Sequence, residues 1–463
     1  MLTYDMERRG TLARYDYLYR CIKEDILAGR LTAGEKLPSK RALAAHLQLG
    51  VVTVESAYAQ LVAEGYVRAE EKRGYFVNEL EAKPNPPPVD LFQEKAPREQ
   101  ENWLLDLKEG GSGTEGFPFS VWARLTRRVL TDRGEELLRA TPHNGAAVLR
   151  RALAAHLYEF RGIRVSPEQI VVGAGTEYLY NLLVQLLGRD RRYGSEDPGY
   201  YKAARIYAIC GADCRPLPVD EQGVEVQTLE NEKIQILHIS PNHQFPTGVV
   251  TPIGRRQSLL RWAQQAPDRY IIEDDYDSEF RFTGRPIPTL QSIDNSGRVI
   301  YVNTFSRSLA PSMRISYMVL PTGLLEEYRR RLGFYSCTVP SIEQYTLADF
   351  LDGGYFESHL NRMRVRYRDR RDRVISMIQE SPLAGRCEVL REDAGLHFLL
   401  RLRTDRTDRE LAGLAEQRKI RLSFLTDYQM AENAAQPHTL IINYPRIDLT
   451  NLAGALTVLS GLL

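Results

Sequence analysis

Three polar segments of the chain carry side chains whose types and spacing suit the binding of charged groups. Residues 173–177, GAGTE, open a predicted helix, and their small side chains let a phosphate approach the backbone N–H groups and the helix dipole. Residues 273–277, EDDYD, present carboxylates that can ligate a metal or hold a positively charged ring nitrogen. Residues 304–314, TFSRSLAPSMR, bring hydroxyls and an arginine into one loop, which suits a phosphate. A metal site needs further oxygen ligands at a suitable spacing, which the sequence does not show, so we expect no metal.

Each of these segments follows a short run rich in β-branched residues, at 169–172, 269–272 and 299–302. Helical patterns lie between the runs, for example at 177–187 and 254–266. This alternation predicts an α/β fold with a mostly parallel central sheet. Ligands of such folds sit at the carboxyl ends of the strands, where the three polar segments fall.

The first 80 residues have a different pattern. Apolar spacing and stop signals predict helices at 15–28, 39–47 and 52–64, followed by two short strands at 66–69 and 75–78. Two helices joined by a short turn and followed by a hairpin with a basic tip suit DNA, with the third helix in the major groove. Short three-helix units also serve as docking modules, so this pattern alone leaves both interpretations open.

A proline-rich stretch separates the two parts. Residues 81–103 begin EAKPNPPPVDLF and carry few apolar side chains, which is typical of a semi-rigid spacer. The predicted organisation is a small domain at 1–80, a linker at 81–103 and a large domain at 104–463.

Composition excludes several classes of protein. Of 463 residues, 43% are hydrophobic and 26% charged, which rules out disorder of the whole chain. No apolar run approaches the roughly 18 residues that span a bilayer, and the N-terminus has charges where a signal peptide has its apolar stretch. Five cysteines are too few for a disulfide scaffold. We therefore expect a cytoplasmic protein without membrane association. A formal net charge of +1 argues against a uniformly basic surface but leaves room for a local nucleic-acid site.

The small domain resembles the winged helix-turn-helix of GntR-type bacterial regulators. The matching segments are ILAGRLTAGEKLPSKRAL at 26–43, TVESAYAQLVAEGYV at 53–67 and RGYFV at 73–77. The resemblance implies double-stranded DNA as a partner. We expect contacts from the following residues: Ser39, Lys40 and Arg41 to phosphate, Thr53 and Ser56 to base edges, and Lys72 and Arg73 from the wing. Gly50 and Val51 stand where many members have a Ser-Arg pair, so the sequence readout differs in detail.

The large domain resembles fold-type I aminotransferases, which use pyridoxal 5′-phosphate, and looks most like the effector half of the MocR subfamily of GntR regulators. The matches run in order: GAGTEYLYNLLVQLL, EDPGYYKAAR, SPNHQFPTGVVTP, IIEDDYDSEFRF and YVNTFSRSLAPSMRISYMVLP. The resemblance implies that Asp274 pairs with the pyridine nitrogen, Tyr276 binds the ring hydroxyl and Tyr200 stacks on the ring. The phosphate would be held by Gly175, Thr176, Thr304, Ser306 and Arg314. Residues 246–248 would shape the floor of the cleft.

One departure from this family changes the expected function. Between Ser306 and Ser308 the family has a lysine that forms a Schiff base with the cofactor aldehyde, and this chain has Arg307. A guanidinium stays protonated and cannot attack a carbonyl or shuttle the protons of transamination. We expect pyridoxal 5′-phosphate to be bound non-covalently or to have been lost, and no catalytic residue. Lys202 is the nearest lysine that the motifs place, where the family often has a substrate-binding arginine.

Other parts of the pocket also depart from the family. Residues 140–145, ATPHNG, lack the tyrosine that often reaches across the dimer toward the phosphate. A carboxylate-binding arginine has no clear position in the C-terminal part, where Arg446 is the nearest candidate. The favoured hypothesis is a regulator whose degenerate aminotransferase-like domain senses a small-molecule effector in a domain-swapped, head-to-tail homodimer. The alternatives are an active aminotransferase, against which Arg307 argues, and a bare dimerisation scaffold.

Overall fold

The computed structural model describes residues 2–80, 103–108, 116–282, 287–393, 395–431 and 436–463. The chain divides into two compact units, Met1–Gln100 and Glu101–Leu463, each of which is described by itself. The predicted linker, apart from residue 103, lies outside the described residues. No helix in the described ranges is long and apolar enough to cross a membrane.

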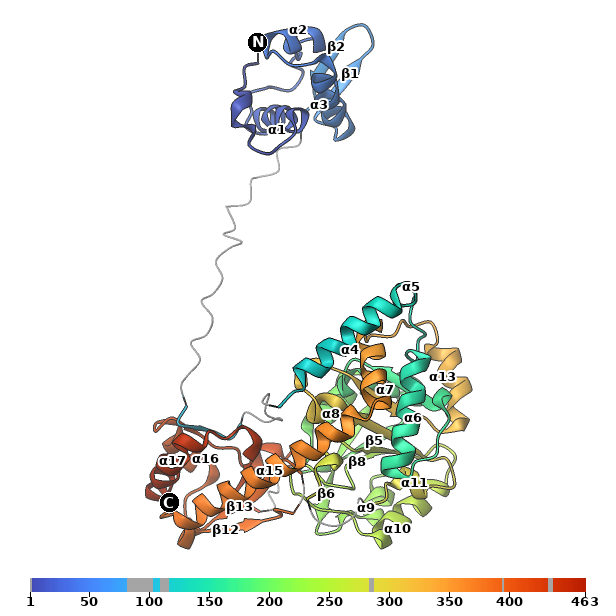
Figure 1. The fold of residues 1–463 in the computed structure, drawn as a ribbon, viewed down its shortest axis with the longest axis vertical. Helices are drawn as coiled ribbons and strands as arrows, with labels where there is room; N and C mark the ends of the chain where they lie inside the picture. The colour runs from blue at the N-terminus through green and yellow to red at the C-terminus, as the bar shows by residue number, and fades with distance from the viewer. Residues whose placement is uncertain (1, 81–102, 109–115, 283–286, 394, 432–435) are drawn as a thin grey trace. The chain divides into compact units, whose positions relative to one another are not determined.

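The smaller unit is a three-helix bundle with a two-stranded wing (Figure 1). Its elements are α1 (Arg14–Leu27), α2 (Lys40–His46), α3 (Val51–Ala63), β1 (Val67–Glu70) and β2 (Gly74–Val77). Strands β1 and β2 pair antiparallel with Val67 opposite Val77. Helix α1 buries Leu18, Ile22 and Ile26 at the spacing of one helical face. The expected helices and strands are present, with bounds that shift by one residue at most ends.

The larger unit contains an eight-stranded sheet in the order β4-β11-β10-β9-β8-β5-β6-β7. The strands are β4 (Ile170–Gly173), β5 (Arg192–Asp197), β6 (Asp213–Asp220), β7 (Gly223–Val224), β8 (Ile236–Ile239), β9 (Tyr270–Asp274), β10 (Val299–Thr304) and β11 (Ser316–Val319). Strands β10, β9, β8, β5 and β6 pair parallel, whereas β11 pairs antiparallel with both β10 and β4. The expected α/β fold with a mostly parallel sheet is confirmed.

Helices cover both faces of this sheet, because its strands bury both sets of alternating side chains. Ile170 and Val172 of β4 pack in the core with α6 (Ala147–Arg161) and α14 (Ser341–Asp352). Val171 packs in a second core with α7 (Thr176–Leu187), α8 (Tyr201–Ile209) and α13 (Leu325–Leu332). A third core lies under α9 (Val226–Asn231) and α10 (Ile253–Gln264).

The C-terminal part of the larger unit forms a smaller subdomain. Helix α15 (Tyr355–Glu380) runs toward a three-stranded antiparallel sheet of β12 (Cys387–Leu390), β13 (Phe398–Leu402) and β15 (Thr439–Ile442) (Figure 1). Helices α16 (Asp408–Glu416) and α17 (Leu449–Leu462) pack beside this sheet, and β14 (Ile420–Arg421) pairs with β3 (Leu105–Asp106). The remaining helices are α4 (Phe119–Asp132), α5 (Gly134–Leu137), α11 (Leu290–Ile293) and α12 (Phe305–Ser308).

Candidate functional site

A cleft of about 460 Å³ lies at the carboxyl ends of β4, β9 and β10. Strands β4 and β10 run in the same direction because each is antiparallel to β11, so the segments that follow them meet at one edge of the sheet. Of the predicted cofactor residues, Thr176, Tyr200, Asp274, Tyr276, Thr304, Ser306 and Arg314 line the cleft, together with Arg307 and Lys202. The structure therefore brings together side chains that are up to 138 positions apart in the sequence, from Thr176 to Arg314.

Asp274 ends β9, and only one of its two carboxylate oxygens has a hydrogen-bond partner among the described residues. Tyr180 donates a hydrogen bond to Oδ2, and His238 Nε2 lies 3.5 Å from the same atom. His238 is oriented in turn by Tyr207, whose hydroxyl lies 2.6 Å from Nδ1. Asp274 is only 6% exposed, and its Oδ1 is buried without a hydrogen-bond partner in the described part of the chain. A buried carboxylate oxygen without a partner is costly, which marks it as an acceptor for a ligand group.

The carboxylates of the 273–277 segment take different roles because successive side chains of a strand point to opposite faces. Glu273 accepts hydrogen bonds from the backbone of Leu290 and Gln291, both at 2.9 Å. Asp275 forms a buried ion pair with Arg161. Of the four acidic residues in this segment, only Asp274 lines the cleft.

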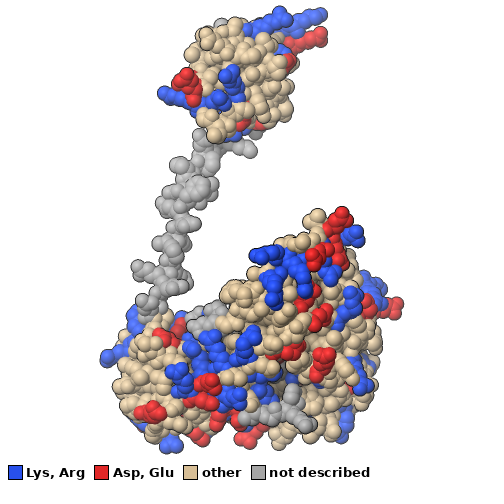
Figure 2. Space-filling model, viewed as in Figure 1, with Lys and Arg blue, Asp and Glu red and all other residues tan. Residues whose placement is uncertain are grey.

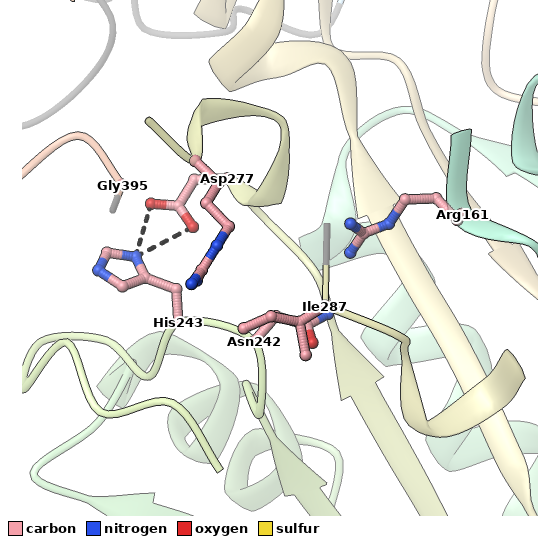
Figure 3. A pocket seen from close by; sticks show the side chains of 7 residues that line it. Arg161, Asn242, His243, Asp277, Ile287 and Gly395 are labelled. Atoms are coloured by element: carbon pink, nitrogen blue, oxygen red, sulfur yellow. Dashed lines mark hydrogen bonds and ion pairs between the residues drawn. The ribbon is translucent and has the colours of Figure 1, made fainter. Parts of the chain in front are cut away.

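The ring of Tyr276 lies against a buried histidine. Tyr276 Oη is 3.1 Å from His243 Nδ1, and the same nitrogen is 2.9 Å from Asp277 Oδ2. Figure 3 shows His243 and Asp277 pointing toward one another beside Gly395. Gly395 has φ +76°, and a Cβ there would lie 1.9 Å from His243 Cε1. The glycine therefore makes room for the imidazole that supports Tyr276.

His397 completes this buried cluster. Ligand atoms of His243, Asp277 and His397 lie within 4.8 Å of one another. His397 Nε2 is 3.0 Å from the carbonyl oxygen of Pro246, and burial lowers the pKa of His397 to about 3. Hydrogen bonds occupy Nδ1 of His243 and Nε2 of His397, whereas Nε2 of His243 is buried without a hydrogen-bond partner among the described residues.

Arg314 lines the cleft and lies against Gly175, which is not itself among the lining residues. Gly175 adopts φ +93°, and a Cβ at this position would lie 2.3 Å from Arg314 Nη2. The guanidinium therefore lies directly on the glycine backbone at the N-terminus of α7. Arg314 Nη2 is 3.2 Å from Glu177 Oε2, and Lys202 Nζ is 3.7 Å from the other oxygen of Glu177.

The hydroxyl of Thr304 caps the short helix α12. It accepts a hydrogen bond from the backbone N–H of Ser306 at 3.1 Å and one from the Ser316 hydroxyl at 2.8 Å. Thr304 is buried, whereas Ser306 and Arg307 on the first turn of α12 are half-buried. The cap directs this turn, with Ser306 and Arg307, into the cleft.

Tyr200 lies at the N-terminus of α8 and lines the same cleft. Burial raises the pKa of Tyr200 to about 12, while the positive charges of Arg307 and Arg314 act in the opposite direction. The guanidinium carbon of Arg307 is 6.0 Å from the centre of the Tyr276 ring.

Sequence reasoning did not find several residues of the cleft, among them Tyr180, Phe245, His397 and Tyr428. Tyr180 could have been found, because it follows Thr176 by one helical turn and so shares its face. His397 and Tyr428 come from the C-terminal subdomain, and no local motif marks them. Arg446 and residues 140–145 are not among those that line the cleft.

In the smaller unit, Ser39 is the N-cap of α2, and its hydroxyl accepts the Ala42 N–H at 3.2 Å. Lys40 forms an ion pair with Glu55 of α3 at 2.5 Å. Arg41 is exposed and forms no ion pair with a described residue. The free side chain for a phosphate on this helix is therefore Arg41 rather than Lys40.

The exposed face of α3 begins with apolar side chains. Val52 is 73% exposed, Thr53 is half-buried, and the Ser56 hydroxyl donates to the Val52 carbonyl at 2.9 Å. Sequence reasoning missed Val52, although exposed branched side chains at the start of a recognition helix can contact thymine methyl groups.

The wing ends in basic residues. Lys72 sits at φ 58° in the turn, and both Lys72 and Arg73 are exposed. Arg73 forms an ion pair with Glu70 at 2.6 Å. Over the face of the larger unit seen in Figure 2, basic and acidic side chains are interspersed.

Each of the two units matches a known protein family. Residues 14–77 match the family model for bacterial regulatory proteins of the gntR family, and residues 105–443 match aminotransferase class I and II. The HTH-type transcriptional regulator YdeL of Bacillus subtilis (strain 168) is 38% identical over 91% of both chains. The probable rhizopine catabolism regulatory protein MocR of Rhizobium meliloti is 31% identical over 91% of this chain and 88% of its own.

A solved structure shows the same fold for the larger unit. Kynurenine aminotransferase of Pyrococcus horikoshii superposes with a TM-score of 0.68 and 23% identity, over 78% of this chain and 91% of the enzyme. The fold and the matches define a helix-turn-helix transcriptional regulator with an aminotransferase-like domain. The chain belongs to the GntR family of bacterial regulators, among the MocR-like members that carry an aminotransferase class I and II domain.

Proposed function

We propose that the regulator senses a phosphorylated pyridine of the pyridoxal 5′-phosphate type, which binds in the cleft without a covalent bond. The observation that carries this proposal is the buried Oδ1 of Asp274, which has no partner in the described chain. A protonated pyridine nitrogen supplies the missing donor, and the charge-assisted hydrogen bond fits a carboxylate.

The other side of the cleft fits the phosphate of such a ligand. Arg314 lies against the backbone of Gly175, the N-cap of α7. No described side chain caps this helix, so its first backbone N–H groups can donate to a phosphate. We assign the phosphate to Gly175, Thr176, Thr304, Ser306 and Arg314. Tyr200 takes the face of the ring, and Tyr276 its hydroxyl.

Under this proposal, the ligand forms no Schiff base at position 307, because a guanidinium cannot attack its carbonyl group. We infer that Arg307 occupies the position of the Schiff-base lysine, since it lies between Ser306 and Ser308 on α12 and lines the cleft. When bound, the cofactor supplies an electron sink. The described lysines that line the cleft are Lys108, whose side chain is exposed, and Lys202, and neither stands at position 307. Lys202 points its amine toward Glu177 instead.

A working aminotransferase is the second candidate, because Asp274, Tyr276 and Arg314 line one cleft of an aminotransferase-like domain. Assays of the full-length protein with amino acids and 2-oxo acids separate the two functions. We expect background turnover. Sustained turnover would contradict the sensor and support the enzyme.

The DNA-binding function is assigned to the smaller unit, with double-stranded DNA as the partner. We propose that Ser39, Lys40 and Arg41 contact phosphate, Thr53, Ser56 and Val52 contact base edges, and Lys72 and Arg73 contact the backbone from the wing. The paired side chains of Lys40 and Arg73 would exchange a carboxylate for a phosphate on binding. The affinity for DNA should fall steeply with salt, because phosphate contacts release counterions.

We further propose a domain-swapped, head-to-tail homodimer in which two small units read two half-sites. Large apolar side chains on the larger unit support self-association: Phe119 is 74% exposed, Leu138 88% and Phe334 77%. Sedimentation at micromolar concentration tests this, and a monomer would contradict it.

A further inference from the structure

Arg307 differs from Arg314 and Lys202, two other cations that line the cleft, in what surrounds it. Arg314 and Lys202 share the carboxylate of Glu177, at 3.2 Å and 3.7 Å. Arg307 forms no ion pair with any residue in the described ranges, although it is half-buried. A guanidinium held in a pocket without a carboxylate partner keeps its five donors for a ligand.

The charge of Arg307 acts on other side chains that line the cleft. Burial raises the pKa of Tyr200, Tyr276 and Tyr428, and the positive charge of Arg307 partly opposes this rise. Burial lowers the pKa of His397, and Arg307 contributes to this fall. The ring of Tyr276 is centred 6.0 Å from the guanidinium carbon of Arg307. Arg307 therefore places a positive charge in the cleft, beside Tyr276.

We propose that Arg307 makes the cleft selective for a phosphorylated 3-hydroxypyridine whose C4 substituent is anionic, such as a carboxylate. This inference rests on the proposed function, because it uses the same ring site. It replaces the usual requirement for an aldehyde with a requirement for negative charge.

The chemistry of the ring supports this assignment. In a 3-hydroxypyridine, the C4 substituent is adjacent to the hydroxyl and para to the ring nitrogen. A ring with its nitrogen at Asp274 and its hydroxyl at Tyr276 therefore carries the C4 substituent toward the residues beside Tyr276, which include Arg307. A carboxylate can accept two parallel hydrogen bonds from a guanidinium, whereas an ammonium group is repelled by it.

The test is a series of probes that share the phosphorylated 3-hydroxypyridine and differ only in the C4 substituent, whose charge is negative, zero or positive. Calorimetry of the full-length protein at pH 7.5 would compare 4-pyridoxate 5′-phosphate, pyridoxine 5′-phosphate and pyridoxamine 5′-phosphate, which carry a carboxylate, a neutral alcohol and an ammonium. We expect affinity to fall in that order, with at least about a tenfold ratio between the first and the last, as a charge-assisted hydrogen bond supports. No aldehyde probe is used, because aldehydes react with surface lysines.

Two variants isolate the guanidinium. Arg307→Gln should reduce the ratio of carboxylate to ammonium affinity to about twofold or less, because the charge is removed. Arg205→Gln is the matched control, since Arg205 is exposed on α8 and does not line the cleft, and it should keep the wild-type ratio.

The outcomes separate this inference from the proposed function. Equal affinities of the wild type for all probes, or a ratio that Arg307→Gln leaves unchanged, would overturn the inference while the ring site stands. Failure of all three probes to bind would contradict the ring site itself and the inference with it. If Arg307→Gln misfolds, equal affinities in the wild-type series still overturn the inference.

Discussion

Tyr180 donates its hydroxyl hydrogen to Oδ2 of Asp274, and this leaves the other carboxylate oxygen as the buried acceptor of the cleft. The tyrosine comes from α7 and the aspartate from β9, so the pair links this helix to the end of this strand. This contact fixes the direction of the acceptor before any ligand arrives.

Removing the Tyr180 hydroxyl should therefore weaken ligand binding as well as the fold. For Tyr180→Phe we expect a loss of about 1–3 kcal/mol in the free energy of unfolding, because a buried charged acceptor loses its donor. The affinity for pyridoxine 5′-phosphate should fall by about tenfold or more for the same reason. Urea denaturation and calorimetry measure the two effects. Tyr193→Phe is the control, since Tyr193 is equally buried but bonds the Gly188 carbonyl, so its ligand affinity should not change.

The Gly395 position should not tolerate a side chain. Gly395→Ala places a Cβ about where His243 Cε1 now lies, in a backbone conformation that disfavours side chains. We expect a loss of about 1–3 kcal/mol from overpacking alone, and displacement of His243 from Tyr276. Gly385→Ala is the control, because no atom lies within 4 Å of its Cβ position. Equal urea midpoints for the two variants would contradict the packing described here.

The Arg161–Asp275 pair should contribute more to stability than surface ion pairs do. Both side chains are at most 10% exposed, and Tyr301 also donates to Asp275 at 2.6 Å. Arg161→Met should cost about 3–5 kcal/mol, because it leaves an uncompensated buried charge. Arg330→Met, which breaks an exposed pair with Glu327, should change the denaturation midpoint little.

Stability should fall as the pH rises through neutrality, partly because of Glu196. Burial raises the pKa of Glu196 to about 8, from an ordinary value near 4.5. The folded state then binds the proton more tightly than the unfolded state, so the stabilisation is complete below pH 4.5 and is lost as the pH rises through 8. Urea denaturation between pH 5 and 9 measures this slope, which Glu196→Gln should reduce. An unchanged slope in the variant would show that Glu196 is ionised in the folded protein.

DNA-binding measurements test whether Arg41, which forms no ion pair with a described residue, contacts a phosphate. Arg41→Ala should weaken binding to a fragment from upstream of the coding sequence and to unrelated sequences about equally. It should also reduce the slope of log affinity against log salt by about one. Arg8→Ala is the control, because Arg8 lies outside α2 and α3 and pairs with Asp5. A loss confined to one sequence would instead make Arg41 a base-reading residue.

The sequence predicted those parts of the site that depend on strand ends and helix starts. Asp274 and Thr304 follow apolar runs, Gly175 precedes a helical pattern, and Ser39 precedes another, so their positions follow from local patterns. The parallel sheet then brings the strand ends to one edge.

Side-chain contacts between segments that are distant in the sequence could not be predicted from local patterns. Nothing local shows that Asp274 meets Tyr180 while Asp275 meets Arg161, because both contacts join segments about 90 or more positions apart. The pairing of Lys40 with Glu55 likewise depends on how α2 crosses α3. His397 reaches the cleft from the C-terminal subdomain, whose placement no motif encodes.

The central claim is that the cleft binds its ligand without a covalent bond because residue 307 is an arginine. The most direct measurement saturates the wild type and Arg307→Lys with pyridoxal 5′-phosphate, treats both with borohydride and maps pyridoxyl-modified peptides by mass spectrometry. We predict a stoichiometric modification at position 307 in the variant and no stoichiometric modification of a cleft lysine in the wild type. A stoichiometric adduct on Lys108 or Lys202 of the wild type, or a variant that gains none at position 307, would contradict the account.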